Sequence, residues 1–90
     1  MTTNKLESQI RTYVAENILY THDFPHDDDA SFLNSGLIDS LGVMELLMYV
    51  QTEFGIHVSP LEVTPENFDS VARLSAYIRS KLQEPLAIPA

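Results

Sequence analysis

The 90-residue chain contains no cysteine, and only five basic residues stand against thirteen acidic ones. Without cysteine there is neither a disulfide framework nor thiolate chemistry from the protein itself. The net charge of -8 argues against nucleic-acid binding, which needs cationic side chains to neutralise phosphates, and against anionic membrane surfaces. Partner proteins with basic patches suit this charge. The simpler interpretation is that acidity keeps the chain soluble and monomeric.

A long apolar run is also lacking. No stretch approaches the roughly 20 apolar residues that span a bilayer, and residues 1–5 hold no secretory apolar region. We therefore expect a cytoplasmic protein without membrane insertion. With 44% hydrophobic residues, the chain suits one domain over residues 1–90. We expect order over about 4–83 and a flexible tail over 84–90, where Pro85 and Pro89 favour extended backbone.

Apolar residues recur at helical spacing in three segments, which glycine, proline and acidic clusters separate. The predicted helices are 5 to about 19, capped by Asn4, then 40–54, ending at Gly55, and about 70–82, with one or two short turns at 59–62 and 64–67. This order predicts an all-α fold: a small antiparallel four-helix bundle with three longer helices, a short third helix and a long first loop.

The predicted core lies on one stripe of each helix and at the end of the first loop. Its expected members are Leu6, Ile10, Tyr13, Val14, Ile18, Phe32, Leu33, Leu37, Ile38, Val43, Leu46, Leu47, Val50, Phe54, Val71, Leu74, Ile78 and Leu82.

A second apolar stripe on the helix 40–54 lies roughly opposite its core face. It holds Leu41, Met44 and Met48, with Glu45 beside it. One interpretation makes it extra core covered by the loop, which would half-bury Leu41. The other makes it a docking surface, because exposed methionine adapts to several partners. We favour docking for Met44 and Met48.

The sequence Gly36-Leu37-Ile38-Asp39-Ser40-Leu41 leads directly into this helix. It places a serine hydroxyl at a helix start, directly after a carboxylate. Unpaired N–H groups and the positive dipole end favour an attached phosphate there. Asp and Ser are also ordinary helix caps, so the pair alone does not decide between cap and attachment site.

Other motifs lie at matching positions along the chain, and together with this one they resemble the pattern of a known family. They are the loop end Phe-Leu-x-Ser-Gly-Leu-Ile-Asp-Ser-Leu, the helix end Phe54-Gly55-Ile56 and the turn Thr64-Pro65-Glu66-Asn67-Phe68. Over about residues 6–82 the chain resembles acyl and peptidyl carrier proteins. The form Ser-Gly-Leu-Ile-Asp-Ser is more similar to free-standing aminoacyl, D-alanyl or specialised acyl carriers than to fatty-acid synthesis carriers. Gly42, Gln51 and Thr52 occupy places where the latter are often acidic.

The resemblance implies a non-catalytic carrier. Ser40 would bear 4'-phosphopantetheine, transferred from coenzyme A by a phosphopantetheinyl transferase, and cargo would be held on it as a thioester. Asp39 would contact the metal ion of that transferase. Leu41, Met44, Glu45 and Met48 would contact partners, which include an adenylating acyl or aminoacyl ligase and a downstream transferase or synthase.

Two other functions are alternatives to a carrier. An unmodified acidic adaptor would bind partner proteins through the helix 40–54. A hydrolase using Ser40 would need a paired base, and His22, His26 and His57 are expected at the surface or in loops rather than in a catalytic or zinc set. Asp27-Asp28-Asp29 lacks the ligand pattern of a calcium loop and is expected to be a solvated acidic segment.

Overall fold

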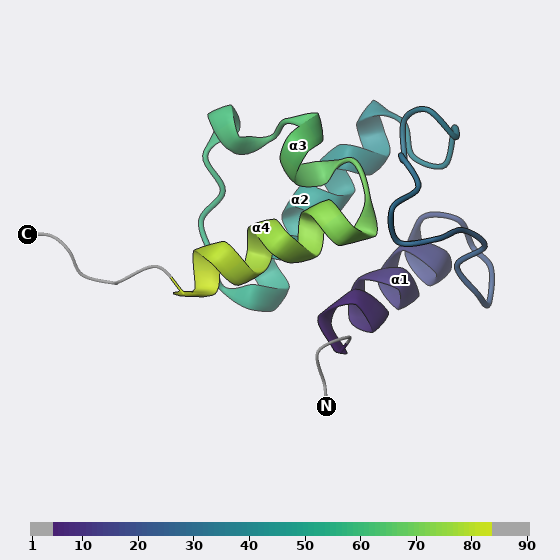
Figure 1. Cartoon of the computed structure of the whole chain (residues 1–90), viewed down its shortest axis with the longest axis horizontal. Helices are drawn as coiled ribbons and strands as arrows, with labels where there is room; N and C mark the ends of the chain where they lie inside the picture. The colour runs from purple at the N-terminus through teal and green to yellow at the C-terminus, as the bar shows by residue number, and fades with distance from the viewer. Residues whose placement is uncertain (1–4, 84–90) are drawn as a thin grey trace, which may run out of the picture.

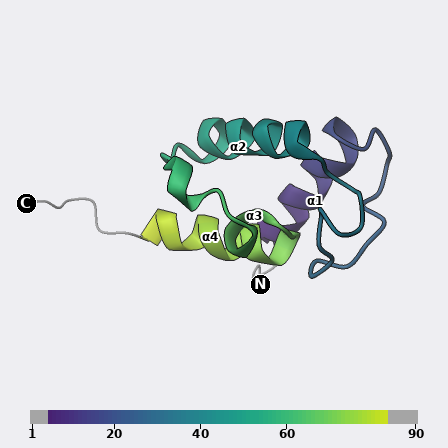
Figure 2. The ribbon, with the colours of Figure 1, turned by 90° about the horizontal axis from the view of Figure 1, so that it is seen from above.

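The computed structural model describes residues 5–83 (Figure 1). Its elements are α1 (Lys5–Asn17), α2 (Ser40–Phe54), the 3-10 turn η1 (Pro60–Glu62), α3 (Pro65–Phe68) and α4 (Val71–Gln83). Helix α1 is antiparallel to α2 and α4, which run in the same direction (Figure 1, Figure 2). The predicted all-α bundle with a short third helix and a long first loop is confirmed. The predicted cap Asn4 and the tail 84–90 lie outside the described residues.

The helix bounds follow from local chemistry. Helix α2 ends as predicted because Gly55 adopts the left-handed conformation (φ 66°) and its N–H donates to Gln51 O at 3.0 Å. Helix α1 ends at Asn17, two residues before the predicted end, and the chain leaves through Tyr20 at a positive φ of 57°. Nowhere in residues 5–83 is a helix long and apolar enough to cross a membrane.

The core gathers buried side chains from all four α-helices and from the loops between them. They are Ile10, Val14, Phe32, Ile38, Leu46, Val50, Val58, Phe68, Val71, Leu74, Tyr77 and Ile78. Two predicted members are wrong: Leu33 is 51% exposed and Leu82 is 53% exposed. Leu33 follows Phe32 in a turn where only Phe32 enters the core, and Leu82 lies a full turn beyond Ile78, the last core residue of α4.

Carboxylates connect the elements at the surface. Glu7 on α1 accepts two hydrogen bonds from the Arg79 guanidinium on α4, at 2.7 and 2.8 Å, and these lower the pKa of Glu7. Glu62 connects η1 to α4, because its carboxylate accepts a hydrogen bond from the Tyr77 hydroxyl at 2.9 Å. The same carboxylate accepts the N–H of Ser59, directly before η1, at 3.0 Å. The Ser59 N–H is the main reason why the pKa of Glu62 is lowered. The stabilisation that the ionised Glu7 and Glu62 carboxylates contribute is fully present above the ordinary carboxyl pKa. It is lost as the pH falls through the lowered pKa of each group.

The loop between α1 and α2 is acidic, but the expectation that 27–29 is simply solvated is wrong at Asp28. Its carboxylate accepts two hydrogen bonds from Arg11 Nη1, at 2.7 and 2.8 Å. Its backbone oxygen also accepts the N–H of Ala72 at 2.9 Å. Asp28 therefore fastens the loop both to α1 and to the first turn of α4, whereas Asp27 and Asp29 are exposed.

Candidate functional site

Asp39 caps the first turn of α2. Its backbone is extended, with φ -100° and ψ -170°, and its Oδ1 accepts the Gly42 N–H at 2.9 Å. Its backbone oxygen accepts the Val43 N–H at 3.0 Å, which closes the first helical turn. The side chain thus satisfies a backbone donor that the helix leaves unpaired, and it brings negative charge to the positive end of the dipole. The helix-cap interpretation of Asp39 therefore holds.

Ser40 is the first residue of α2, and its side chain is exposed. The N–H groups of Ser40 and Leu41 have no acceptor within their own helix, because helical bonding begins only with later residues. The negatively charged oxygens of a phosphate attached to the serine would therefore lie next to backbone N–H donors and the positive end of the helix dipole. With an accessible hydroxyl at this position, the residues present fit a phosphodiester on Ser40.

The loop before Ser40 is held by backbone hydrogen bonds around a buried phenylalanine. The N–H groups of Leu37 and Ile38 both donate to Phe32 O, at 2.9 and 3.3 Å. The Phe32 and Ile38 side chains are buried in the core. Ser40 follows Ile38 by two residues, so the packing of Phe32 and Ile38 fixes where the exposed serine stands.

Asp69, at the end of α3, holds this loop from the other side. Its backbone oxygen accepts the Phe32 N–H at 2.7 Å. Its carboxylate accepts the Ser31 hydroxyl at 2.5 Å and the Leu33 N–H at 3.0 Å. The sequence does not indicate this role, because nothing local connects Asp69 with Ser31, 38 positions earlier.

Gly42 is buried against Ile38, a contact that the sequence does not indicate either. A Cβ atom at Gly42 would stand 2.5 Å from Ile38 Cγ2, closer than carbon atoms pack. Ile38 belongs to the core and cannot easily turn away. The first turn of α2 therefore lies directly over Ile38 only because residue 42 lacks a side chain.

Overpacking costs about 1–3 kcal/mol, and the helix preference of alanine over glycine offsets roughly 1 kcal/mol of that cost. We therefore expect Gly42→Ala to lower the free energy of unfolding by up to about 2 kcal/mol. Urea unfolding of the variant measures it. Thr52→Ala, at an exposed position of the same helix, is the control and should stay near the parent. A Gly42→Ala protein more stable than the parent, as helix propensity alone predicts, would contradict the steric account.

The second apolar stripe of α2 is exposed. Leu41, Met44 and Met48 are 74%, 53% and 64% exposed, and we call them the α2 strip. The alternative that the loop half-buries Leu41 is wrong. Glu45 is exposed beside them, while its backbone oxygen accepts the Tyr13 hydroxyl at 3.4 Å. The structure therefore places all the predicted partner-binding side chains on the surface, on the helix that Ser40 begins.

The remaining candidates form no site. His22, His26 and His57 are exposed, as expected. Between residues 5 and 83, no three side chains of histidine, aspartate or glutamate are grouped so that they could hold a metal ion.

Comparison with known proteins agrees with this geometry. A family model described as "Phosphopantetheine attachment site" matches residues 8–78. A D-alanyl carrier protein of Abiotrophia defectiva is 38% identical over 56 residues, which cover 62% of this chain and 71% of the relative. Aminoacyl carrier protein 2 of Bradyrhizobium diazoefficiens is 30% identical over 79 residues, or 88% of this chain and 84% of the relative. Aminoacyl carrier protein 1 of the same organism is 29% identical over 84 residues, or 93% and 89%.

The match spans most of the chain, and both aminoacyl carriers align over most of their own length. The predicted family and the predicted acyl or aminoacyl carrier function are therefore confirmed. Members of this family are non-catalytic and carry covalently attached 4'-phosphopantetheine. The chain belongs to the family of phosphopantetheine-bearing acyl and aminoacyl carrier proteins.

Proposed function

We propose that Ser40 is the attachment residue and that the protein carries an aminoacyl group. The observation that carries the first part is the exposed Ser40 hydroxyl at the first residue of α2, beside free N–H groups of the helix start. The names of the relatives, D-alanyl and aminoacyl carriers, support the second part. When bound, 4'-phosphopantetheine supplies a thiol that holds the aminoacyl cargo as a thioester.

A phosphopantetheinyl transferase would perform the attachment. The Ser40 oxygen bonds to the phosphorus that carries the pantetheine arm in coenzyme A. The bond from that phosphorus to the bridging oxygen breaks, adenosine bisphosphate leaves, and a base of the transferase takes the hydroxyl proton. Asp39 uses Oδ1 for the cap, and its side chain is exposed. The carboxylate is therefore accessible to the magnesium ion of the transferase, and oxygen ligands suit that ion.

The experiment is to incubate the purified chain with coenzyme A and a broad-specificity transferase and to measure its intact mass. We expect a gain of one phosphopantetheine, which peptide mapping locates at Ser40. A chain that stays unmodified would favour the rival function, an acidic adaptor that binds proteins through α2. If the chain is modified, loading it with different amino acids by an adenylating ligase tests the proposed cargo class.

The α2 strip is the proposed docking surface for these enzymes. Met44→Glu or Met48→Glu removes apolar contact area and adds a charge that must be desolvated in the complex. We expect unchanged folding, because both side chains are more exposed than buried. We also expect docking to weaken by about 1–2 kcal/mol, so that the carrier concentration for half-maximal loading rises roughly 5–30-fold.

Melting curves and loading rates over a range of carrier concentrations measure the two effects. Ala76→Glu is the control, because Ala76 is exposed on α4, which lies across the molecule from α2 (Figure 2). It adds the same charge and should leave the loading curve unchanged. Equal curves for all three variants would mean that partners dock elsewhere. Large losses of stability at Met44 and Met48 would place them in the core.

A further inference from the structure

A tight turn over residues 31–37, which we call the 31–37 turn, comes shortly before Ser40. Backbone hydrogen bonds close it and join Ser35 to Ser31 at 3.1 Å, Gly36 to Leu33 at 3.2 Å and Leu37 to Phe32 at 2.9 Å. The Phe32 side chain is buried in the core, whereas residues 33–36 are exposed. Only Ile38 and Asp39 separate the turn from the serine, so the turn forms part of the surface beside the Ser40 hydroxyl.

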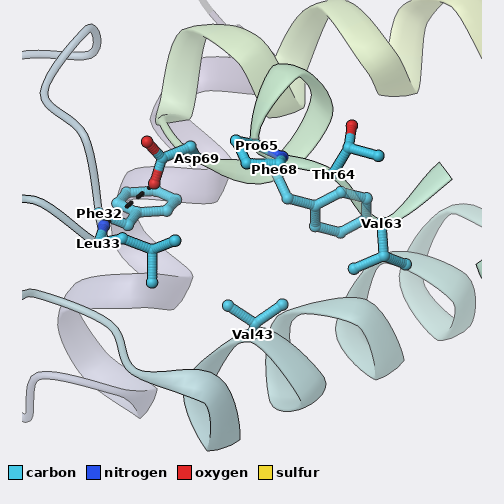
Figure 3. Close-up of a pocket in the computed structure, with 8 residues that line it drawn as sticks. All are labelled: Phe32, Leu33, Val43, Val63, Thr64, Pro65, Phe68 and Asp69. Atoms are coloured by element: carbon cyan, nitrogen blue, oxygen red, sulfur yellow. Dashed lines mark hydrogen bonds between the residues drawn. The ribbon is translucent and has the colours of Figure 1, made fainter.

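The first backbone N–H groups of the 31–37 turn have no acceptor within the turn itself, as at the start of a helix. Asp69 supplies acceptors from outside. Its backbone oxygen accepts the Phe32 N–H at 2.7 Å, and its Oδ1 accepts the Leu33 N–H at 3.0 Å, the bond drawn in Figure 3. Asp69 therefore caps a turn that lies more than 30 residues away in sequence.

The second carboxylate oxygen of Asp69 extends this cap through Ser31. It accepts the Ser31 hydroxyl at 2.5 Å, and the same Ser31 oxygen accepts the Asn34 N–H at 3.0 Å. Both oxygens of the Asp69 carboxylate are thus used inside the molecule. The side chain holds the exposed part of the turn and is not directed to a ligand.

The side chain of Asp69 can be removed without opening the core. The bond to the Phe32 N–H comes from the Asp69 backbone, so a substitution retains it. The Phe32 ring is held by its burial. The bonds that would be lost are those to Ser31 and Leu33. Loss of the carboxylate should therefore loosen residues 33–36 while the rest of the fold stays in place.

Order in this turn matters to an enzyme that acts on Ser40. Such an enzyme must cover the exposed hydroxyl, and the 31–37 turn presents the half-exposed, apolar Leu33 next to it. If the turn is mobile, binding has to order it. Ordering the backbone of a single residue costs about 5–30-fold in affinity. A turn that is already ordered in the free carrier avoids this loss.

We propose that Asp69 is a positioning residue for the reaction at Ser40, because its carboxylate orders the 31–37 turn against which the phosphopantetheinyl transferase binds. The inference rests on the proposed attachment at Ser40. Asp69 acts through Ser31 and Leu33 and takes no part in the transfer itself. Its loss should therefore weaken binding of the carrier and leave the chemical step unchanged.

The test is the rate of phosphopantetheine attachment over a range of carrier concentrations, with coenzyme A saturating. For Asp69→Ala we expect the carrier concentration at half-maximal rate to rise about 5–30-fold, with the maximal rate close to that of the parent. Asp27→Ala is the matched control, because it removes the same charge from an exposed position of the same loop. It should leave the curve unchanged.

Nitrogen-15 relaxation of the unmodified carrier shows whether the turn is what changes. In Asp69→Ala the amide order parameters of residues 33–36 should fall from about 0.85 to about 0.6 or below, while those in the middle of α2 stay high. Asp69→Asn keeps an oxygen for the Leu33 N–H, so both readouts should lie between parent and alanine variant. If Asp69→Ala does not fold, Asp69→Asn and Ser31→Ala provide the same comparison.

An unchanged half-saturating concentration, whether the turn is loose or rigid, would overturn this inference and leave the proposed function standing. Weaker binding with a rigid turn would overturn it too, because Asp69 would then contact the transferase directly. An equal loss in Asp27→Ala would reduce the effect to net charge, and a loss confined to the maximal rate would place it in the chemical step; each overturns the inference. A parent chain that gains no phosphopantetheine at Ser40 would overturn both.

Discussion

Replacing Ser40 with alanine should abolish phosphopantetheine attachment and leave the fold intact. The serine oxygen is the proposed bonding atom, and alanine has none. The structure also separates attachment from folding, because the capping hydrogen bond to Gly42 comes from Asp39 and not from Ser40. Alanine is the best helix former, and Ser40 is exposed. The free energy of unfolding should therefore change by less than about 0.5 kcal/mol.

Intact mass after incubation with transferase and coenzyme A, paired with a melting curve, measures both parts. Ser80→Ala is the control, since Ser80 is an exposed serine on α4, and it should gain the group as the parent does. A Ser40→Ala protein that still gains phosphopantetheine would refute the site. One that melts far below the parent would mean that Ser40 has a structural part in α2.

Features set by neighbours in sequence could be predicted. The bounds of α2 depend on the Asp39 cap and on Gly55, both of which act within one helical turn. Its two faces follow from the 3.6-residue period, which separated buried Leu46 and Val50 from the exposed α2 strip. The short turn predicted at 59–62 is likewise observed as η1, with Pro60 at its first position.

Features that join distant segments could not be predicted. Asp69 binds residues 31–33, and Asp28 binds Arg11 and Ala72, yet an aspartate in sequence carries no indication of its partner. The need for glycine at 42 depends on where Ile38 packs. The exposure of Leu33 depends on which of two adjacent apolar residues in an irregular loop turns inward, and no periodicity decides that.

Phe32 connects these long-range contacts with the serine, so its replacement by alanine should have the largest effect on stability. The side chain is fully buried and packs edge-to-face on Phe24, with ring centroids 6.3 Å apart. Its backbone accepts the N–H groups of Leu37 and Ile38. Phe→Ala in a packed core costs about 3–5 kcal/mol. In a domain of this size each kcal/mol lowers the melting temperature by about 4–8 °C.

We therefore expect Phe32→Ala to melt roughly 12–40 °C below the parent. Leu33→Ala is the matched control, because Leu33 is the next residue but half-exposed, and it should melt within a few degrees of the parent. Hydrogen exchange at temperatures where Phe32→Ala is still folded shows whether the loop loosens first. The amides of Leu37 and Ile38 should then exchange faster relative to those in the middle of α2, since their acceptor is Phe32 O. Equal melting of both variants would mean that the loop, and with it the position of Ser40, is held by contacts other than Phe32.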